Sequence, residues 1–355
     1  MIIARTPFRI SFFGGGTDYP QWYRQHGGAV LATTIDKYCY LTVRYLPPFF
    51  EHRTRVVYSK IENVNSADEI THPSVRATLK FLKINRGVEI HHDGDLPARS
   101  GMGSSSSFTV GLLQALHALQ GRMVSKSRLA SESIHIEQEV LRETVGSQDQ
   151  VMAAHGGFNH VRFHIGGELD VQPLLIPRQR LLELNDHLML FYTGIVRTAS
   201  DVAGAYVGNL SAQGPLLRTL SQLVDEAIAL LSSRQDITGF GKLLHEAWVA
   251  KSSLSDAISN RAIDLIYDAA RTAGANGGKL LGAGGGGFLL LFAPPARQAR
   301  IRRRLAQYLH VPFHFEHAGS QIVFFDPESD YAAEERQRDR QVIQPFRELP
   351  PVEAA

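Results

Sequence analysis

Residues 96–107 read Leu96-Pro97-Ala98-Arg99-Ser100-Gly101-Met102-Gly103-Ser104-Ser105-Ser106-Ser107 and separate a predicted strand, residues 87–92, from a predicted buried helix, residues 105–119. Glycines allow close backbone approach, serines cap helices and donate hydrogen bonds, and the first turn of a helix carries unpaired N–H groups. The sequence therefore predicts an anion-binding loop, and a phosphate group is the simplest ligand for it. A capping loop with surplus serines is the plainer alternative. The loop is not a Walker motif, since it has no glycine-lysine pair followed by Ser or Thr.

The next predicted helix, residues 126–143, carries a carboxylate on its apolar face. At about 100° per residue, Glu137 falls on the same side as Ala130, Ile134 and Leu141. Burying a carboxylate is costly unless it is paired or binds a metal. Glu137 is therefore a candidate metal ligand, with a partner arginine or a less buried face as the alternatives.

A second carboxylate, Asp149, follows in Gly146-Ser147-Gln148-Asp149-Gln150, a glycine-flanked turn that precedes an apolar segment. Taken alone, this aspartate is typical of a turn or cap. A phosphate cradle, a hard oxygen ligand for Mg²⁺ and a carboxylate near an acceptor hydroxyl are together the minimum apparatus for phosphoryl transfer.

Another glycine run, residues 282–287, formally contains the pattern GxGxxG. A dinucleotide-binding fold needs a strand before this pattern and a helix after it. Here residues 261–273 are predicted as helix and residues 288–292 as strand, so that fold is not supported. The run is either a loop that approaches a ligand with its backbone or a tight structural turn.

The composition is that of an ordinary globular protein, with 355 residues, 44% hydrophobic and 20% charged. At about 150 residues per domain, the length indicates two domains. A net charge of +2 leaves no large positive field for nucleic acid or an anionic membrane, so neither is an expected partner.

The cysteine content and the apolar segments bear on location. Cys39 is the single cysteine, so no intramolecular disulfide can form, which fits a reducing compartment. Residues 1–13 carry Arg5 and Arg9 and do not resemble a signal peptide. The longest charge-free run, residues 280–296, is too short and too rich in glycine and proline for a membrane helix. We expect a cytoplasmic protein.

The order of predicted elements gives an α+β fold of two domains. The first domain, residues 1–180, starts with strands and continues with helices, and the second, residues 181–335, mixes both. Residues 336–355 are expected to form a loose tail after a final helix. The predicted strands are residues 2–13, 38–45, 87–92, 158–163, 188–192, 288–292 and 321–325, and the predicted helices of the second half are residues 213–232, 236–256, 260–274 and 296–309.

Three separated stretches resemble the three motifs of the GHMP kinases, the superfamily of galacto-, homoserine, mevalonate and phosphomevalonate kinases. They are Thr6-Pro7-Phe8-Arg9 through Gly14-Gly15-Gly16-Thr17-Asp18, the loop from Pro97 to Ser107, and Lys279-Leu280-Leu281-Gly282-Ala283-Gly284-Gly285-Gly286-Gly287-Phe288. Within the superfamily they look most like the D-glycero-D-manno-heptose 7-phosphate kinases. The resemblance implies an amino-terminal α/β domain with a left-handed crossover, a carboxy-terminal ferredoxin-like domain, and a site between them.

The resemblance also implies the role of each motif residue. Asp149 would take or orient the proton of the attacking sugar hydroxyl, and Arg9 would lie beside it and steady the phosphoryl group. Ser105 and Glu137 would hold Mg²⁺. The residues implied to bind ATP phosphates are Gly101, Met102, Gly103, Ser104, Ser105 and Ser106, and those implied to bind the sugar are Gly16, Thr17, Asp18, Gly284 and Gly285. Met102 for leucine, and serines at 106 and 107 for alanines, are mild departures from the family pattern.

The expected acceptor is a sugar or sugar phosphate, with ATP as donor and Mg²⁺ as metal; a homodimer is a further expectation. A sugar 7-phosphate needs an anchor for its distal phosphate, for which Arg197 is the first choice, before Lys37 and Arg99; each could equally be a surface cation. The alternatives are an anomeric kinase of unphosphorylated galactose or fucose, and a sugar-binding sensor of the same fold without turnover. Scattered histidines are favoured over a zinc site.

Overall fold

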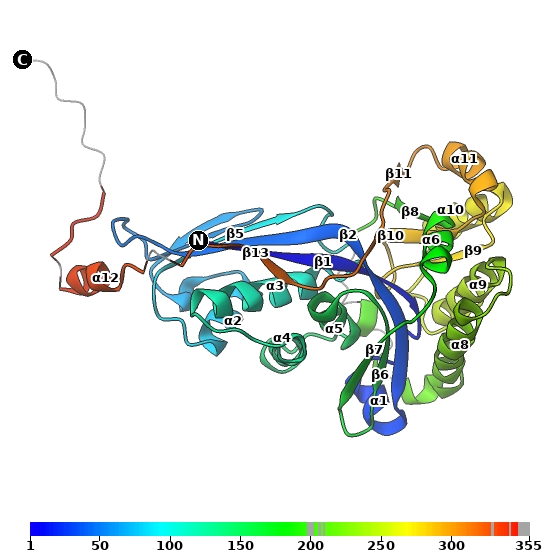
Figure 1. Ribbon diagram of the computed structural model, residues 1–355, viewed down its shortest axis with the longest axis horizontal. Coiled ribbons are helices and arrows are strands. Elements are labelled where there is room, and N and C mark those ends of the chain that lie inside the picture. Colours follow the sequence, from blue (N-terminus) through cyan, green and yellow to red (C-terminus); the bar gives the residue numbers. More distant parts are fainter. Residues whose placement is uncertain (197–201, 205–206, 209, 328–329, 341, 347–355) are drawn as a thin grey trace, which may run out of the picture.

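The computed structural model describes residues 1–196, 202–204, 207–208, 210–327, 330–340 and 342–346. A nine-stranded sheet runs along the longer part of the molecule (Figure 1). Its main path has the strand order β13-β1-β2-β5-β3-β4, while β6 and β12 also pair with β2, and β7 pairs with β6. Its strands are β1 (Ile2–Phe13), β2 (Gly28–Tyr45), β3 (Thr54–Val57), β4 (Ile61–Val64), β5 (Val88–Gly94), β6 (Phe158–Phe163), β7 (Leu169–Pro173), β12 (Phe315–Glu316) and β13 (Gln321–Phe325).

Strand β1 lies between the edge strand β13 and β2, and its last residues, Phe12 and Phe13, meet the second part of the molecule. From Thr6 onward every residue of β1 is buried, because both faces of the strand are covered. The antiparallel pairing with β2 shifts register between Pro7 and Arg9 and again between Ser11 and Phe13. Such bulges re-aim side chains and are common beside active sites.

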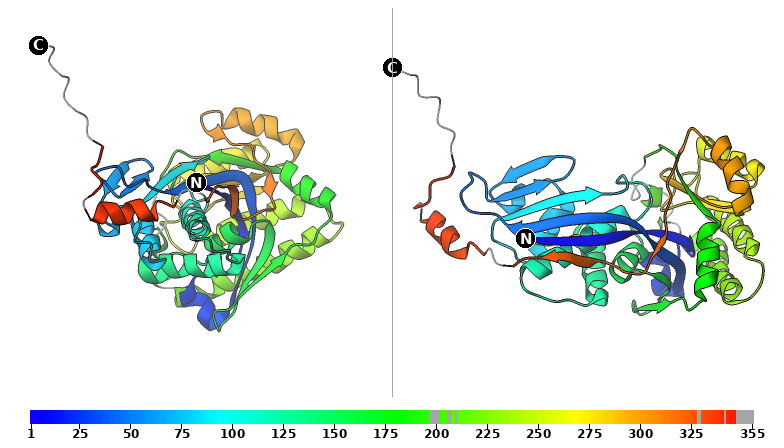
Figure 2. Two further views of the ribbon diagram at one scale, coloured as in Figure 1. Left: turned by 60° about the vertical axis from the view of Figure 1, so that its left-hand side comes forward. Right: turned by 45° about the horizontal axis from the view of Figure 1, so that its top comes forward.

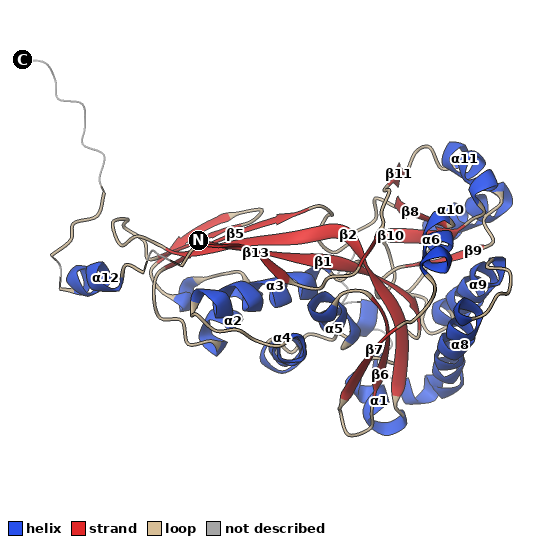
Figure 3. Ribbon diagram, in the orientation of Figure 1, coloured by secondary structure: helices blue, strands red, loops and turns tan. Residues whose placement is uncertain are grey.

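Helices pack against one face of the large sheet (Figures 1 and 3). Gly111 lets the buried helix lie close to β1, because a Cβ there would meet Thr6 Oγ1 at 2.7 Å. The helices of this part are α1 (Pro20–His26), η1 (Ala67–Glu69), α2 (Pro73–Phe81), α3 (Ser104–Leu119), α4 (Lys126–Ile134), the π-helix η2 (His135–Val140) and α5 (Gln148–His155).

A second, four-stranded antiparallel sheet with the order β11-β8-β10-β9 forms the core of the other part. Phe240 joins the two parts, since its ring lies 5.4 Å from Phe12 and 5.2 Å from Phe13. The elements are α6 (Arg178–Asp186), β8 (Leu188–Tyr192), η3 (Leu210–Gln213), α8 (Gly214–Ser232), α9 (Thr238–Ser252), α10 (Arg261–Ala273), β9 (Gly277–Leu280), β10 (Phe288–Phe292), α11 (Pro295–Arg304) and β11 (Leu309–His310).

The α+β class and most predicted elements are confirmed. Strands β1, β6, β8, β10 and β13 have the predicted ends, and α3 and α10 match within one residue. The predicted helix over residues 126–143 is present from Lys126 to Val140, but its second half is the π-helix η2 and it ends three residues earlier than expected. A π-helix differs from an α-helix in its hydrogen bonds, which join residues five apart instead of four. Hydrophobic periodicity over so short a segment does not distinguish the two.

The chain returns to the first sheet near its carboxyl end, so two strands of that sheet come from residues 181–335, the predicted second domain. Strand β12 pairs with β2, and β13 pairs with β1 as the edge strand. The return is visible in Figure 2, where the segment after α11 runs back along the first sheet. The last helix, α12 (Ala332–Asp339), and residues 342–346 extend beyond the sheet, and Phe346 contacts Phe49 at a ring distance of 5.8 Å. Among the described residues no helix is both long and apolar enough to span a membrane.

Candidate active site

The serine-glycine loop turns into α3 with its backbone donors open. Gly101 and Gly103 have φ values of +81° and +75°, a backbone region that favours glycine. Met102 is fully buried and anchors the loop, and its carbonyl accepts a 3.1 Å bond from the Arg9 backbone N–H. No side chain caps the first turn of α3. The loop therefore offers free N–H groups at the positive end of a 16-residue helix.

Arg9 and Asp149 form a two-bond ion pair beside this loop. Arg9 Nε and Nη2 donate to the two carboxylate oxygens of Asp149, each at 2.7 Å, and Nη1 donates to Gly101 O at 2.7 Å. The arginine side chain is 4% exposed and the carboxylate 25%. The bulge of β1 and the first turn of α5 bring together two residues that are far apart in the chain. One carboxylate therefore touches both an arginine and the edge of the predicted phosphate cradle.

Glu137 is completely buried on η2 and faces the start of α3. Its Oε2 accepts bonds from Ser106 Oγ at 2.9 Å and from Gln150 Nε2 at 2.5 Å. Burial raises the pKa of this carboxyl to about 7; the Thr109, Ser106 and Gln150 side chains lower it and Glu143 raises it further. A carboxylate with so high a pKa is poised to gain from a cation.

Ser105 and Glu137 are the residues predicted to hold Mg²⁺, and in the structure the serine that hydrogen-bonds Glu137 is the neighbouring Ser106. Ser105 is exposed at the first turn of α3, whereas Ser106 is 4% exposed and points inward. The reason is geometric: successive helical side chains are about 100° apart, so only one of two neighbours can face η2. The serine at position 106, a departure from the family pattern, is therefore the residue that holds the glutamate.

A divalent cation fits this arrangement. Glu137 Oε1 is buried and has no hydrogen-bond partner among the described residues, and it lies on the side of α3 where the loop begins. In the described part of the chain no cluster of three or more His, Cys, Asp or Glu side chains could hold a metal. The residues therefore suit an ion that takes one carboxylate and completes its shell with phosphate oxygens and water, as Mg²⁺ does.

Asp18 lies on the other side of Asp149, at the end of the first glycine run. Its Oδ1 accepts from the Gly16 N–H at 2.9 Å, and its backbone carbonyl accepts from Ser147 at 2.9 Å. Burial and the charge of Asp149 raise its pKa, while the Gly16 N–H and the charge of Lys251 lower it. Thr17, by contrast, uses its hydroxyl inside the fold, donating to Gly14 O at 2.8 Å and to Ala29 O at 3.0 Å.

The third glycine run is a hairpin loop between β9 and β10, so a strand, not the expected helix, comes directly before it. A strand also follows, and the exclusion of a dinucleotide fold holds. Gly282 packs against the phosphate loop, where an added Cβ would meet Gly101 Cα at 2.6 Å. Gly284 and Gly285, predicted to bind the sugar, lie beside Ile258, whose carbonyl accepts from Gly285 N–H at 2.8 Å.

Two buried lysines near the ion pair were missed by the sequence reasoning. Lys251 on α9 is 6% exposed and donates to Gly282 O, and Lys279 on β9 is 2% exposed and donates to Phe12 O at 2.9 Å. Burial lowers the pKa of both, that of Lys251 to about 8. A signal existed for Lys251, which lies on the apolar stripe of α9, seven residues after the buried Leu244.

Three cations are the predicted anchors for a distal phosphate. Arg197 lies outside the described residues. Lys37 donates to the carboxylate of Asp36 at 3.0 Å, and the side chain of Arg99 is exposed at the phosphate loop.

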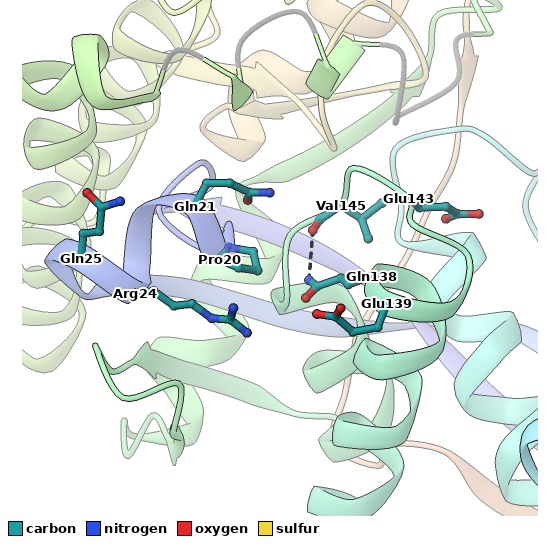
Figure 4. A pocket seen from close by; sticks show the side chains of 8 residues that line it. All are labelled: Pro20, Gln21, Arg24, Gln25, Gln138, Glu139, Glu143 and Val145. Atoms are coloured by element: carbon teal, nitrogen blue, oxygen red, sulfur yellow. Dashed lines mark hydrogen bonds between the residues drawn. The ribbon is translucent and has the colours of Figure 1, made fainter.

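A cavity of about 330 Å³ lies between α1 and the segment that follows η2 (Figure 4). Gln138 Nε2 donates to Val145 O at 3.1 Å within its wall. Arg24 brings a positive charge to the cavity, and Glu139 and Glu143 bring negative ones. This mixture suits a polar ligand better than a phosphate group.

Comparison with known proteins identifies two family models along the chain. The model described as GHMP kinases N terminal domain matches residues 73–157, and that described as GHMP kinases C terminal matches residues 226–311. The first contains the phosphate loop, Glu137 and Asp149, and the second contains Lys251 and the third glycine run.

The chain is similar to curated and solved sugar kinases. It is 29% identical to a D-glycero-alpha-D-manno-heptose 7-phosphate kinase of Campylobacter jejuni, over 86% of this chain and 93% of that protein. It is 26% identical to a bifunctional fucokinase/GDP-fucose pyrophosphorylase of Arabidopsis thaliana, over 85% of this chain and 31% of that protein. The crystal structure of a D-glycero-D-manno-heptose 1-phosphate kinase from Bacteroides thetaiotaomicron has a TM-score of 0.76 at 22% identity, covering 92% of this chain and 100% of that one.

Proposed function

The chain belongs to the GHMP kinases, and from this membership we propose that it transfers the γ-phosphoryl group of ATP to the anomeric hydroxyl of D-glycero-D-manno-heptose 7-phosphate, giving the 1,7-bisphosphate. Support for a sugar acceptor comes from the similarity to the heptose 7-phosphate kinase over most of both chains. The observation that carries the proposal is the two-bond pair of Arg9 and Asp149 against Gly101 of the phosphate loop.

Each part of the site has a role in this reaction. The open N–H groups of the loop and of the first turn of α3 would bind ATP phosphates. Asp149 would accept the proton of the sugar hydroxyl as its oxygen attacks, and Arg9 would hold Asp149 in place and offset charge on the transferring group. Asp18 would bind a sugar hydroxyl. Glu137, to which Ser106 is bonded, would hold Mg²⁺ together with Ser105 at the start of α3, and the ion neutralises phosphate charge when bound.

The pairing of Arg9 with Asp149 bears on how the base works. A carboxylate held by two guanidinium bonds has a fixed orientation. Asp149 therefore suits the task of orienting the sugar hydroxyl and accepting its proton. Positioning and charge stabilisation, not strong basicity, supply most of the rate enhancement in phosphoryl transfer.

A second function is favoured by the similarity to the fucokinase, namely an anomeric kinase of an unphosphorylated sugar. The same residues would carry the same chemistry, and only the acceptor would differ. A sensor without turnover is disfavoured, because a pure binder has no need of the Arg9–Asp149 pair or of a buried metal ligand.

The test is Mg²⁺-dependent release of ADP from ATP with a panel of acceptors: D-glycero-D-manno-heptose 7-phosphate, sedoheptulose 7-phosphate, mannose, galactose and fucose. Selective turnover of the heptose phosphate, with the product's new phosphate on the anomeric carbon by NMR, is the expected result. Turnover of a free sugar alone would move the function to the second candidate, and binding without ADP release would support a sensor. The homodimer and the cytoplasmic location stay predictions, for sedimentation and for imaging.

A further inference from the structure

Gly15 lies in a run of glycines, but its own backbone does not require glycine. Gly14 and Gly16 have φ values of +81° and +114°, and a Cβ on Gly14 would meet Ala29 O at 1.9 Å. Gly15 has no positive φ, and the nearest atoms to a Cβ there would be 3.7 Å away, which is ordinary van der Waals contact. The missing side chain at position 15 therefore leaves a small space that the fold itself does not demand.

Three polar groups surround this space. The Cβ position of Gly15 lies 3.7 Å from Gln148 Nε2, 3.7 Å from Ser11 Oγ and 3.8 Å from Lys251 Nζ. They come from α5, β1 and α9, so both parts of the molecule contribute. Each can donate a hydrogen bond, and one carries a positive charge. We call Ser11, Gln148 and Lys251 around Gly15 the Gly15 cradle.

The cradle is buried but incompletely bonded. Ser11, Gln148 and Lys251 are 5%, 9% and 6% exposed. Ser11 Oγ has no hydrogen-bond partner among the described residues, and Lys251 uses one of its N–H groups on Gly282 O. The unpaired atom of Gln148 is its amide oxygen Oε1, whereas Nε2 is the atom that faces the Cβ position of Gly15. Leaving a buried polar atom unpaired costs about 1–3 kcal/mol, so native folds rarely do so without a ligand or water to complete the bonds.

The Gly15 cradle lies next to Asp18 and Asp149, the two carboxylates that are proposed to contact the acceptor sugar. Gln148 directly precedes Asp149, and the charges of Asp18 and Asp149 both act on the Lys251 ammonium. We propose that the Gly15 cradle binds one hydroxyl oxygen of the acceptor sugar and that Lys251 is an acceptor-binding residue. This inference rests on the proposed function. Three donors that converge on one point can donate to a single oxygen, and space for one methyl-sized group suits a hydroxyl better than a whole phosphate.

Lys251 also makes acceptor binding depend on the contact between the two parts of the molecule. Its helix belongs to the second part, its bond to Gly282 O holds the third glycine run, and that run packs on the phosphate loop at Gly101. The acceptor hydroxyl would thus be bound only where α9, β1 and α5 meet.

The experiment compares Gly15→Ala, Lys251→Met and the control Lys242→Met, which changes an exposed lysine on the same helix. The alanine methyl group fits without a clash, fills the cradle and leaves Lys251 in place. The probe is D-glycero-D-manno-heptose 7-phosphate, or the panel sugar that the wild-type protein phosphorylates. Calorimetry measures its Kd without ATP, steady-state kinetics give both KM values, and thermal melting checks folding.

We expect Gly15→Ala and Lys251→Met to raise the acceptor Kd and KM at least about tenfold, the loss expected for a hydrogen bond to a charged donor. The KM for ATP should stay within about twofold of wild type, and Lys242→Met should change neither value. A folded Gly15→Ala variant with the wild-type acceptor Kd would overturn the inference, even if Lys251→Met lowered the melting temperature and weakened both substrates. If the wild-type protein binds no sugar of the panel, the proposed function itself fails.

Discussion

Asp149→Asn tests the site most directly, because the change preserves the shape of the side chain and removes its charge. Both carboxylate oxygens accept bonds from Arg9 at 2.7 Å. The amide has only one acceptor oxygen, and its NH₂ group would oppose an N–H of the guanidinium. One of the two bonds would therefore become a donor–donor contact, and Arg9, 4% exposed, would lose its counter-ion.

The expected losses follow from this geometry. A positioned acid or base contributes about 10²–10⁴ to the rate, so we expect kcat to fall at least about 100-fold. Breaking a fully buried ion pair costs about 3–5 kcal/mol and breaking an exposed one up to about 1 kcal/mol. With one partner buried and the other 25% exposed, we expect the free energy of unfolding to fall by about 2 kcal/mol.

The assay is single-turnover ADP formation by rapid quench at saturating acceptor, with urea unfolding for stability and calorimetry for a non-hydrolysable ATP analogue. Affinity for the analogue should change by no more than about threefold, because Arg9 still contacts the phosphate loop at Gly101. The matched control is Asp170→Asn, which breaks an exposed pair with Arg162 at 2.7 Å and should leave kcat unchanged. Turnover near wild type in a folded Asp149→Asn variant would refute the role of this carboxylate.

Three further outcomes follow from burial, backbone geometry and charge. The raised pKa of Glu137, about 7, means that the folded state binds its proton more tightly than the unfolded state, so metal-free stability should fall as pH rises from about 4.5 to 7, by up to about 3 kcal/mol. Urea unfolding at pH 5 and 8 should show that the free energy of unfolding of Glu137→Gln changes less with pH than that of the wild type. The same variant should need more Mg²⁺ for activity. An unchanged pH dependence of stability would contradict the raised pKa of Glu137. Gly282→Ala should weaken ATP binding and lower stability more than Gly121→Ala does. Both glycines have φ near +70°, but only a Cβ at position 282 would meet Gly101. Equal effects of the two changes in calorimetry and thermal melting would show that the contact between Gly282 and Gly101 is unimportant. Lys251, whose charged neighbours are Asp18, Asp149, Arg9 and Lys279, should lose its proton as the pH rises above 8. The acceptor KM of the wild type should therefore rise above pH 8, whereas the acceptor KM of Lys251→Met should not change with pH in this range.

Much of the fold was predictable, because local pattern determines it. The apolar runs of β1 and β8 and the buried stripe of α3 each depend on side chains within one element, and their ends came out as expected or within a residue. Glu137 was also correctly placed on a buried face, since the same periodicity applies to its helix.

The errors concern relations between elements. Whether residues 126–143 continue as an α-helix depends on how η2 packs against α3. Which serine, Ser105 or Ser106, bonds Glu137 depends on how α3 is rotated about its axis. The return of β12 and β13 to the first sheet depends on strand pairing across most of the chain length. None of these relations leaves a periodic signal within one segment.

The sequence by itself determined the class of the fold, the serine-glycine loop before α3 and the burial of Glu137, because loop composition and helical periodicity are properties of short segments. The tertiary structure alone decided that Arg9 holds Asp149 by two bonds, that Gly282 packs on Gly101, and that Lys251 reaches the space beside Gly15. These contacts join residues more than 100 positions apart, and their distances are set by how bulges, turns and helix axes pack in three dimensions.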